Sequence, residues 1–88
     1  RLKQPELWDE YLAQMAAWER PAGLVSMHIA RTSERDLCFV GLWDSEDAIA
    51  AARPQMIALL DQQRPMLDEL SVDLGCTDPV SGPLLLSD

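Results

Sequence analysis

Apolar residues near the start of the chain recur with the period of a helix. The stripe consists of Trp8, Tyr11, Leu12, Met15 and Ala16. Pro5 and Glu6 suit the first turn of a helix, where a missing N–H is harmless and an acid meets the positive end of the helix dipole. The breakers in 20–23 mark the other end. The spacing therefore predicts a helix over residues 5–19.

Two strand-length apolar runs follow the predicted helix. They are "LVSMHIAR" over Leu24–Arg31 and "LCFVGLW" over Leu37–Trp43, and the polar segment Thr32–Asp36 separates them. Runs of this length and composition on either side of a short polar loop predict a β-hairpin. We assume that Arg31 lies opposite Leu37 across this loop, and a slip of one residue would exchange the two faces of the hairpin.

This register sorts the hairpin side chains onto two faces. One face carries Val25, Met27, Ile29, Leu37, Phe39 and Trp43, and the other carries Ser26, His28, Ala30, Cys38, Val40 and Leu42. A solvated sheet face would be polar, and neither of these faces is charged, so we expect both to be buried. The bulkier face suits helices. We expect the smaller face to pack on a second sheet around a cavity, and another copy of the chain supplies that sheet most simply, in a two-fold dimer.

The second hairpin strand leads into a second predicted helix. Asp44 is placed to cap its start, and Asp47 adds an acid to its first turn. Apolar residues continue to Leu60, and Pro54 is expected to break or kink the helix near Arg53 because it lacks an N–H and clashes with the preceding turn.

The remaining segments complete the predicted order of elements. Pro65 is expected to start a short turn, and the alternation in Leu70–Cys76 predicts a strand. Within the C-terminal segment Thr77–Asp88, whose role the pattern leaves open, Leu84–Leu86 suit either a last short strand or an arm that reaches a partner. Arg1–Lys3 resemble the end of a strand. The order is β-α-β-β-α-β in one domain over 1–88, an α+β ferredoxin-like fold with an antiparallel sheet.

Composition narrows the partners and cofactors. Lys and Arg number 7 against 15 Asp and Glu, for a net charge of −8, which disfavours nucleic acid and anionic membranes. No apolar stretch approaches the roughly 20 residues of a membrane span. With two cysteines and one histidine we expect no disulfide framework, no metal site and no cofactor. We expect a cytoplasmic protein that gains stability by pairing with itself.

Two stretches resemble a known family. "PAGLVSMHIAR" over 21–31 and "LWDSEDAIAAA" over 42–52 are similar to dimeric α/β-barrel proteins, and most similar to the antibiotic biosynthesis monooxygenase (ABM) domain family. The resemblance covers about the whole chain, with the first strand expected to be cut short at Arg1. It implies a homodimeric α/β barrel. Members of the family include cofactor-independent quinol and polyketide oxygenases, haem-degrading monooxygenases and proteins of no known activity.

The haem-degrading branch of the family shares the Trp-acid-Ser-Glu-Asp junction but places further residues that this chain lacks. Its catalytic tryptophan corresponds to Ala52, and its haem-ligating histidine corresponds to Gln62. No asparagine stands at Arg1–Lys3, where the branch would have its catalytic asparagine. We therefore do not expect haem degradation.

His28 is the one side chain whose ordinary pKa lies near neutrality, so it is the candidate catalytic base toward a small aromatic or quinol-like substrate. The alternative is a hydrogen-bonded, inert histidine at the sheet interface. Ser26, Cys38, Val40 and Trp43 are candidate substrate contacts, although Trp43 equally suits the core and Cys38 an inert small hydrophobe. The function classes left open are a monooxygenase, a non-catalytic ligand-binding or stress-related barrel, and an isomerase or lyase of a sister family.

Overall fold

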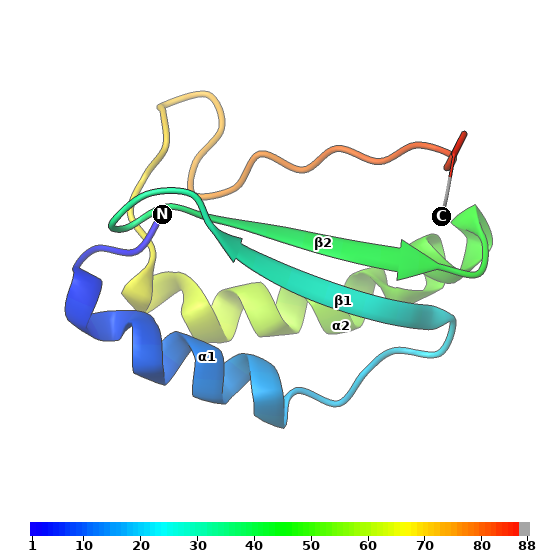
Figure 1. The fold of residues 1–88 in the computed structure, drawn as a ribbon, viewed down its shortest axis with the longest axis horizontal. Helices are drawn as coiled ribbons and strands as arrows, with labels where there is room; N and C mark the ends of the chain where they lie inside the picture. The colour runs from blue at the N-terminus through cyan, green and yellow to red at the C-terminus, as the bar shows by residue number, and fades with distance from the viewer. Residues whose placement is uncertain (87–88) are drawn as a thin grey trace.

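The computed structural model describes residues 1–86 and shows two helices on one side of a β-hairpin (Figure 1). The elements are a 3₁₀ turn (Pro5–Leu7), α1 (Trp8–Ala17), β1 (Leu24–Arg31), β2 (Leu37–Trp43), α2 (Glu46–Gln63) and a second 3₁₀ turn (Arg64–Met66). The predicted helices and hairpin are confirmed, and so is the short turn at Pro65. The chain is an α+β protein of two layers, compatible with a small ferredoxin-like fold.

The hairpin register agrees with the prediction along most of its length. Arg31 lies opposite Leu37, and the strands pair in antiparallel fashion. A bulge between Leu24 and Ser26 shifts the register at the far end, so that Leu24 lies opposite Trp43. Val25 is 61% exposed at this bulge, and its predicted place on the helix-facing side is wrong. A bulged residue is left out of the ladder of paired residues. Leu24, the residue before Val25, therefore takes the helix-facing position opposite Trp43.

The first residue of α1 fastens this helix to the loop of the hairpin. The indole nitrogen of Trp8 donates a 2.8 Å hydrogen bond to the carbonyl oxygen of Glu34. The guanidinium of Arg31 lies 5.1 Å from the centre of the Trp8 ring and donates to the carbonyl oxygens of Ser33 and Glu34. These contacts hold the loop over one end of the helix, because a cation attracts the negative face of an aromatic ring.

The core lies between the helices and the hairpin. Its buried members are Leu2, Tyr11, Met15, Met66 and Leu67. Met27, Ile29 and Leu37 from the hairpin pack against this cluster, as do Leu59 and Leu60 from α2. The core is therefore built from the helix-facing side of the sheet, as the hydrophobic pattern predicted.

The start of α2 differs from the prediction by one residue. The hydroxyl of Ser45 accepts a 3.2 Å hydrogen bond from the backbone N–H of Ala48, so Ser45 is the N-cap and the predicted role of Asp44 is wrong. The backbone N–H of Asp44 instead donates to the carbonyl oxygen of Gly23 at 2.8 Å. That bond fixes Asp44 directly after β2, one residue before the N-cap Ser45.

Pro54 lies inside α2, and the helix runs through it to Gln63. Of the two outcomes predicted near Arg53, a break or a kink, the break is therefore wrong. Proline removes the hydrogen bond to the carbonyl of Ala50, four residues earlier. Both Ala50 and Pro54 are exposed, so water can bond the freed carbonyl.

Leu70–Cys76 does not form the predicted strand. The segment folds into a tight turn in which Gly75 N–H donates to the carbonyl oxygen of Ser71 at 2.9 Å, and Val72 is 91% exposed. Gly75 has a φ of +68°, a left-handed conformation that glycine adopts readily and that reverses the chain. Leu84–Leu86 is not a strand either.

Arg1–Lys3 lies as a short extended stretch between the hairpin loop at Arg35 and the segment at Leu67. Leu2 makes an isolated antiparallel bridge with Leu67, and its N–H donates to the carbonyl oxygen of Arg35 at 2.7 Å. The sheet of the described residues thus has two strands, with single bridges where further strands were predicted. Residues 1–86 therefore do not form the predicted four-stranded sheet, and the dimeric barrel remains a prediction.

Across the described residues, none of the helices has the length and apolar character that crossing a membrane requires.

Candidate functional site

The sheet face away from the helices is uncovered in this structure. It carries Ser26, His28, Ala30, Cys38, Val40 and Leu42, which we call the open sheet face. His28 lies opposite Val40, and the neighbouring rungs are Ala30 with Cys38 and Ser26 with Leu42. None of these side chains is charged, in a chain with 22 charged residues among 88 (7 + 15). An uncharged face of this kind is typical of a surface that another element covers.

The open sheet face is uncovered in the single chain because both helices pack on the other face, as Figure 1 shows. His28, Ala30, Cys38 and Val40 are exposed, whereas Ser26 and Leu42 are half-buried. The sequence predicts that a second copy covers this face, and that burial stays a prediction.

His28 stands at the centre of the open sheet face without a polar partner. Its side chain makes no hydrogen bond within residues 1–86, and its cross-strand neighbour Val40 is apolar. The free thiol of Cys38 lies one rung away on the same face. Nothing in residues 1–86 therefore fixes the orientation of the imidazole, whose two nitrogens are open to a bound molecule.

Four of the five predicted site residues lie together, and the fifth does not. Ser26, His28, Cys38 and Val40 share the open sheet face. Trp43 lies on the helix-facing side, where a methyl group added to Gly41 would stand 3.0 Å from the indole nitrogen of Trp43. Glycine at position 41 therefore lets the indole lie against the strand. In a single chain, Trp43 cannot contact a molecule that rests on His28.

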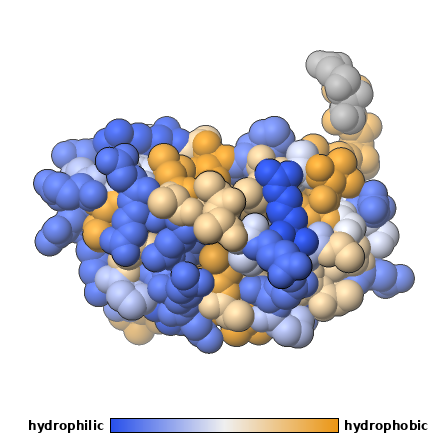
Figure 2. All heavy atoms as spheres, turned by 90° about the horizontal axis from the view of Figure 1, so that it is seen from below, coloured by the Kyte–Doolittle hydropathy of each residue, from blue (hydrophilic) through white to orange (hydrophobic). Residues whose placement is uncertain are grey.

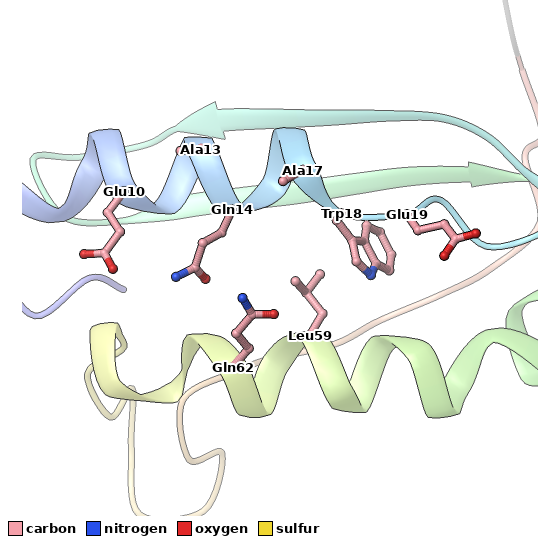
Figure 3. A pocket seen from close by; sticks show the side chains of 8 residues that line it. All are labelled: Glu10, Ala13, Gln14, Ala17, Trp18, Glu19, Leu59 and Gln62. Carbon is pink, nitrogen blue, oxygen red and sulfur yellow. The ribbon is translucent and has the colours of Figure 1, made fainter.

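A hollow lies elsewhere in the described structure, between α1 and α2. It is an open groove of about 450 Å³, lined by Glu10, Ala13, Gln14, Ala17, Trp18, Glu19, Leu59 and Gln62. Figure 3 shows the amides of Gln14 and Gln62 pointing toward one another across it. The oxygen Oε1 of Gln14 is buried and has no hydrogen-bond partner in the described residues. None of the predicted site residues lines this groove.

The hydrophobic pattern of the sequence does not predict this groove. A usable signal was present, because Glu10, Gln14 and Trp18 recur every four residues and so lie on one side of α1. A smaller hollow of about 290 Å³ lies between α1 and β1, where Trp8, Leu12 and Ile29 are among its lining residues. It too is separate from the open sheet face.

The strongest charge pairing lies at the loop end of the hairpin. The guanidinium Nε of Arg1 donates a 2.6 Å hydrogen bond to the carboxylate of Asp36. This bond raises the pKa of Arg1, and together with a bond from the Ser33 hydroxyl it lowers the pKa of Asp36. Within residues 1–86, no three His, Cys, Asp or Glu side chains gather closely enough to hold a metal ion.

No protein-family model, curated protein or solved structure matches this chain. The class of protein is therefore defined by its fold alone, a small two-layer α+β domain with one uncovered sheet face. The resemblance to the ABM family remains a prediction from the sequence.

Proposed function

We propose that two copies of this chain meet through their open sheet faces and enclose a chamber for a small aromatic or quinol-like molecule. In that chamber the protein acts as an ABM-type, cofactor-independent monooxygenase with His28 as its base. The observation that carries the proposal is that the single imidazole of the chain stands on its uncharged and uncovered sheet face.

The charge distribution supports pairing through this face. A chain with a net charge of −8 repels its own copies over most of its surface. The open sheet face carries no charged side chain, so two copies can approach there with the least repulsion. Burial of apolar side chains such as Val40 and Leu42 would then favour association by roughly 25 cal/mol for each Å² removed from water.

The chemistry asked of His28 is a proton transfer. Its neutral imidazole would take a proton from an enolic or phenolic substrate, and the resulting anion gives electrons to O₂. If the substrate reacts at an activated CH₂ group, the reaction is balanced in atoms and electrons, because CH₂ and O₂ yield C=O and water. The substrate supplies all the electrons, so the reaction needs no separate reductant.

A second candidate is a non-catalytic barrel that binds a small ligand. It is favoured by the surroundings of His28, which has an apolar neighbour in Val40 and no hydrogen bond within the described residues. A general base is usually oriented by a further polar group, and none is present on this face apart from Ser26 and Cys38.

Oxygen consumption by the purified protein, measured with a panel of dihydroxy-aromatic compounds, tests the two candidates. The monooxygenase proposal predicts turnover that His28→Ala lowers at least ~100-fold, the low end for loss of a general base. Gln55→Ala, at an exposed position of α2, is the matched control and should keep the wild-type rate. Binding is followed separately by quenching of tryptophan fluorescence. Binding without turnover would leave the second candidate, and the absence of both would reject both.

A further inference from the structure

His28 is the one group on the open sheet face that can gain a charge in mild acid. The other side chains of this face are Ser26, Ala30, Cys38, Val40 and Leu42. The thiol of Cys38 is neutral in acid, and the rest of these side chains do not ionise. An imidazole ordinarily takes up its proton at about pH 6.5, so the face changes from neutral to cationic in mild acid.

No carboxylate lies on the open sheet face to balance that charge. Arg31 is the single charged residue within the two strands, and its guanidinium lies 5.1 Å from the centre of the Trp8 ring of α1. Asp36, just before β2, is held by the guanidinium of Arg1 at 2.6 Å. Both helices pack on the other face of the hairpin, so their acidic side chains lie away from His28 (Figure 1).

The surface of the helix side differs from the open sheet face. Figure 2 looks from below, at the side on which α1 lies in Figure 1, and hydrophilic side chains cover much of that view. Lys and Arg number 7 against 15 Asp and Glu in the whole chain, so two copies repel one another over most of their surface. Pairing through the open sheet face therefore depends on this face staying uncharged.

We infer that protonation of His28 separates the two copies of the proposed homodimer, so that the protein pairs at neutral pH and is monomeric in mild acid. The inference rests on the proposed function and adds the regulation of the same site. A two-fold pair uses the same face of both copies, so it would bury two imidazoles. In acid each would have to leave water as a cation and face the same charge on the other copy. Packed sheets lie about 10 Å apart, and excluded water leaves little screening over that distance.

The direction of the pH effect follows from proton linkage. Two separate chains bind two protons in acid, and the pair binds none while its imidazoles are buried and neutral. Association is therefore strongest above the ordinary imidazole pKa and weakens as pH falls through it. With that pKa at about 6.5, a fall from one pH unit above it to one unit below raises the dissociation constant of the dimer about 100-fold. The same protonation removes the neutral base, so acid would halt turnover and assembly together.

The fold of each copy should survive this change of pH. The bonds that Asp36 receives from Arg1 and from the Ser33 hydroxyl lower its pKa, so the ion pair at the hairpin loop persists in mild acid. His28 is exposed in the single chain, so water solvates its charge there.

Sedimentation velocity over a concentration series, one pH unit above and one below the ordinary imidazole pKa, measures the dissociation constant. His28→Gln keeps a polar and uncharged side chain, and it should dimerise equally at both pH values. His28→Lys is charged at both, and it should raise the constant at the higher pH at least ~100-fold. Gln55→Lys, at an exposed position of α2, is the matched control and should follow the wild type. Circular dichroism at the lower pH shows whether the separated copies are folded.

A dissociation constant that rises at least ~10-fold in acid for the wild type, but not for His28→Gln, would support the switch. A rise that His28→Gln shares, a His28→Gln variant that is monomeric at the higher pH, a His28→Lys variant that still dimerises, or acid unfolding of the wild type would overturn it. A wild type that dimerises with a smaller change leaves the homodimer standing and rejects the switch. A wild type that is monomeric at both pH values rejects the proposed homodimer as well.

Discussion

His28 lies directly opposite Val40 on the sheet face that turns away from both helices. Each of these side chains is exposed, and each is surrounded by uncharged neighbours from the same two strands. The helices fill the opposite face, so the hairpin divides the molecule into a packed side and an uncovered side. The function proposed for His28 depends on what covers the open sheet face.

The N-cap of α2 gives the first prediction. Ser45→Ala removes the hydroxyl that accepts the N–H of Ala48, and it should lower the free energy of unfolding by about 1 kcal/mol. Asp44→Ala is the matched control, because only the backbone of Asp44 makes a bond here, to Gly23. Urea unfolding measures both variants. An equal loss in the two would show that Ser45 does not cap the helix.

The two glycines with positive φ give the second prediction, because their surroundings differ. Gly75 has a φ of +68° and no atom near an added Cβ, so Gly75→Ala should cost about 1–2 kcal/mol from backbone strain alone. Gly23 has a φ of +87°, and its added Cβ would lie 2.5 Å from the Cβ of Ala48. Gly23→Ala should therefore lose a further ~1–3 kcal/mol from overpacking. Thermal and urea unfolding measure the difference, and a Gly75→Ala loss as large as that of Gly23→Ala would contradict it.

Tyr11 gives a prediction about alkaline pH. Its side chain is buried in the core, and burial raises the pKa of its phenol because the charged form is poorly solvated there. A raised pKa means that the neutral phenol stabilises the fold fully below about pH 10, and that this contribution is lost as pH rises through the folded pKa.

Tyr11→Phe keeps the ring, which contacts Trp8 edge to face at 6.3 Å, and removes the ionising group. The variant should lose less stability than the wild type above about pH 10. Denaturant unfolding as a function of pH measures this. Parallel curves for the two proteins would show that Tyr11 does not govern the alkaline limit.

The sequence predicted the hairpin well because two strand-length apolar runs flank a short polar loop. Its register was assumed from the pairing of Arg31 with Leu37, and the structure has that pairing from Ser26 to Leu42. The bulge at Val25 escaped prediction, since an added residue changes the alternation only locally. The cap at Ser45 escaped it as well, because Asp44 and Ser45 are both good caps and the bond from Asp44 to Gly23 decides between them.

The C-terminal part was predicted less well for a different reason. Alternation over Leu70–Cys76 suits a strand, but a strand needs a neighbour, and the left-handed conformation of Gly75 turns the chain instead. For the candidate site, the pattern placed Ser26, His28, Cys38 and Val40 on one face correctly. The pattern did not predict the groove between α1 and α2. A groove arises from the way two helices pack, and the sequence of one helix alone does not show it.

Sedimentation velocity at micromolar concentration tests most directly whether a second copy covers the open sheet face. We expect a dimer for the wild type and a folded monomer for Val40→Asp. In the dimer the substitution would bury a carboxylate at the centre of the interface, whereas in the single chain position 40 is exposed and tolerates the charge. Val72→Asp, at an exposed position in the turn of residues 71–75, should remain a dimer. A monomeric wild type, or a Val40→Asp variant that still dimerises, would contradict the account.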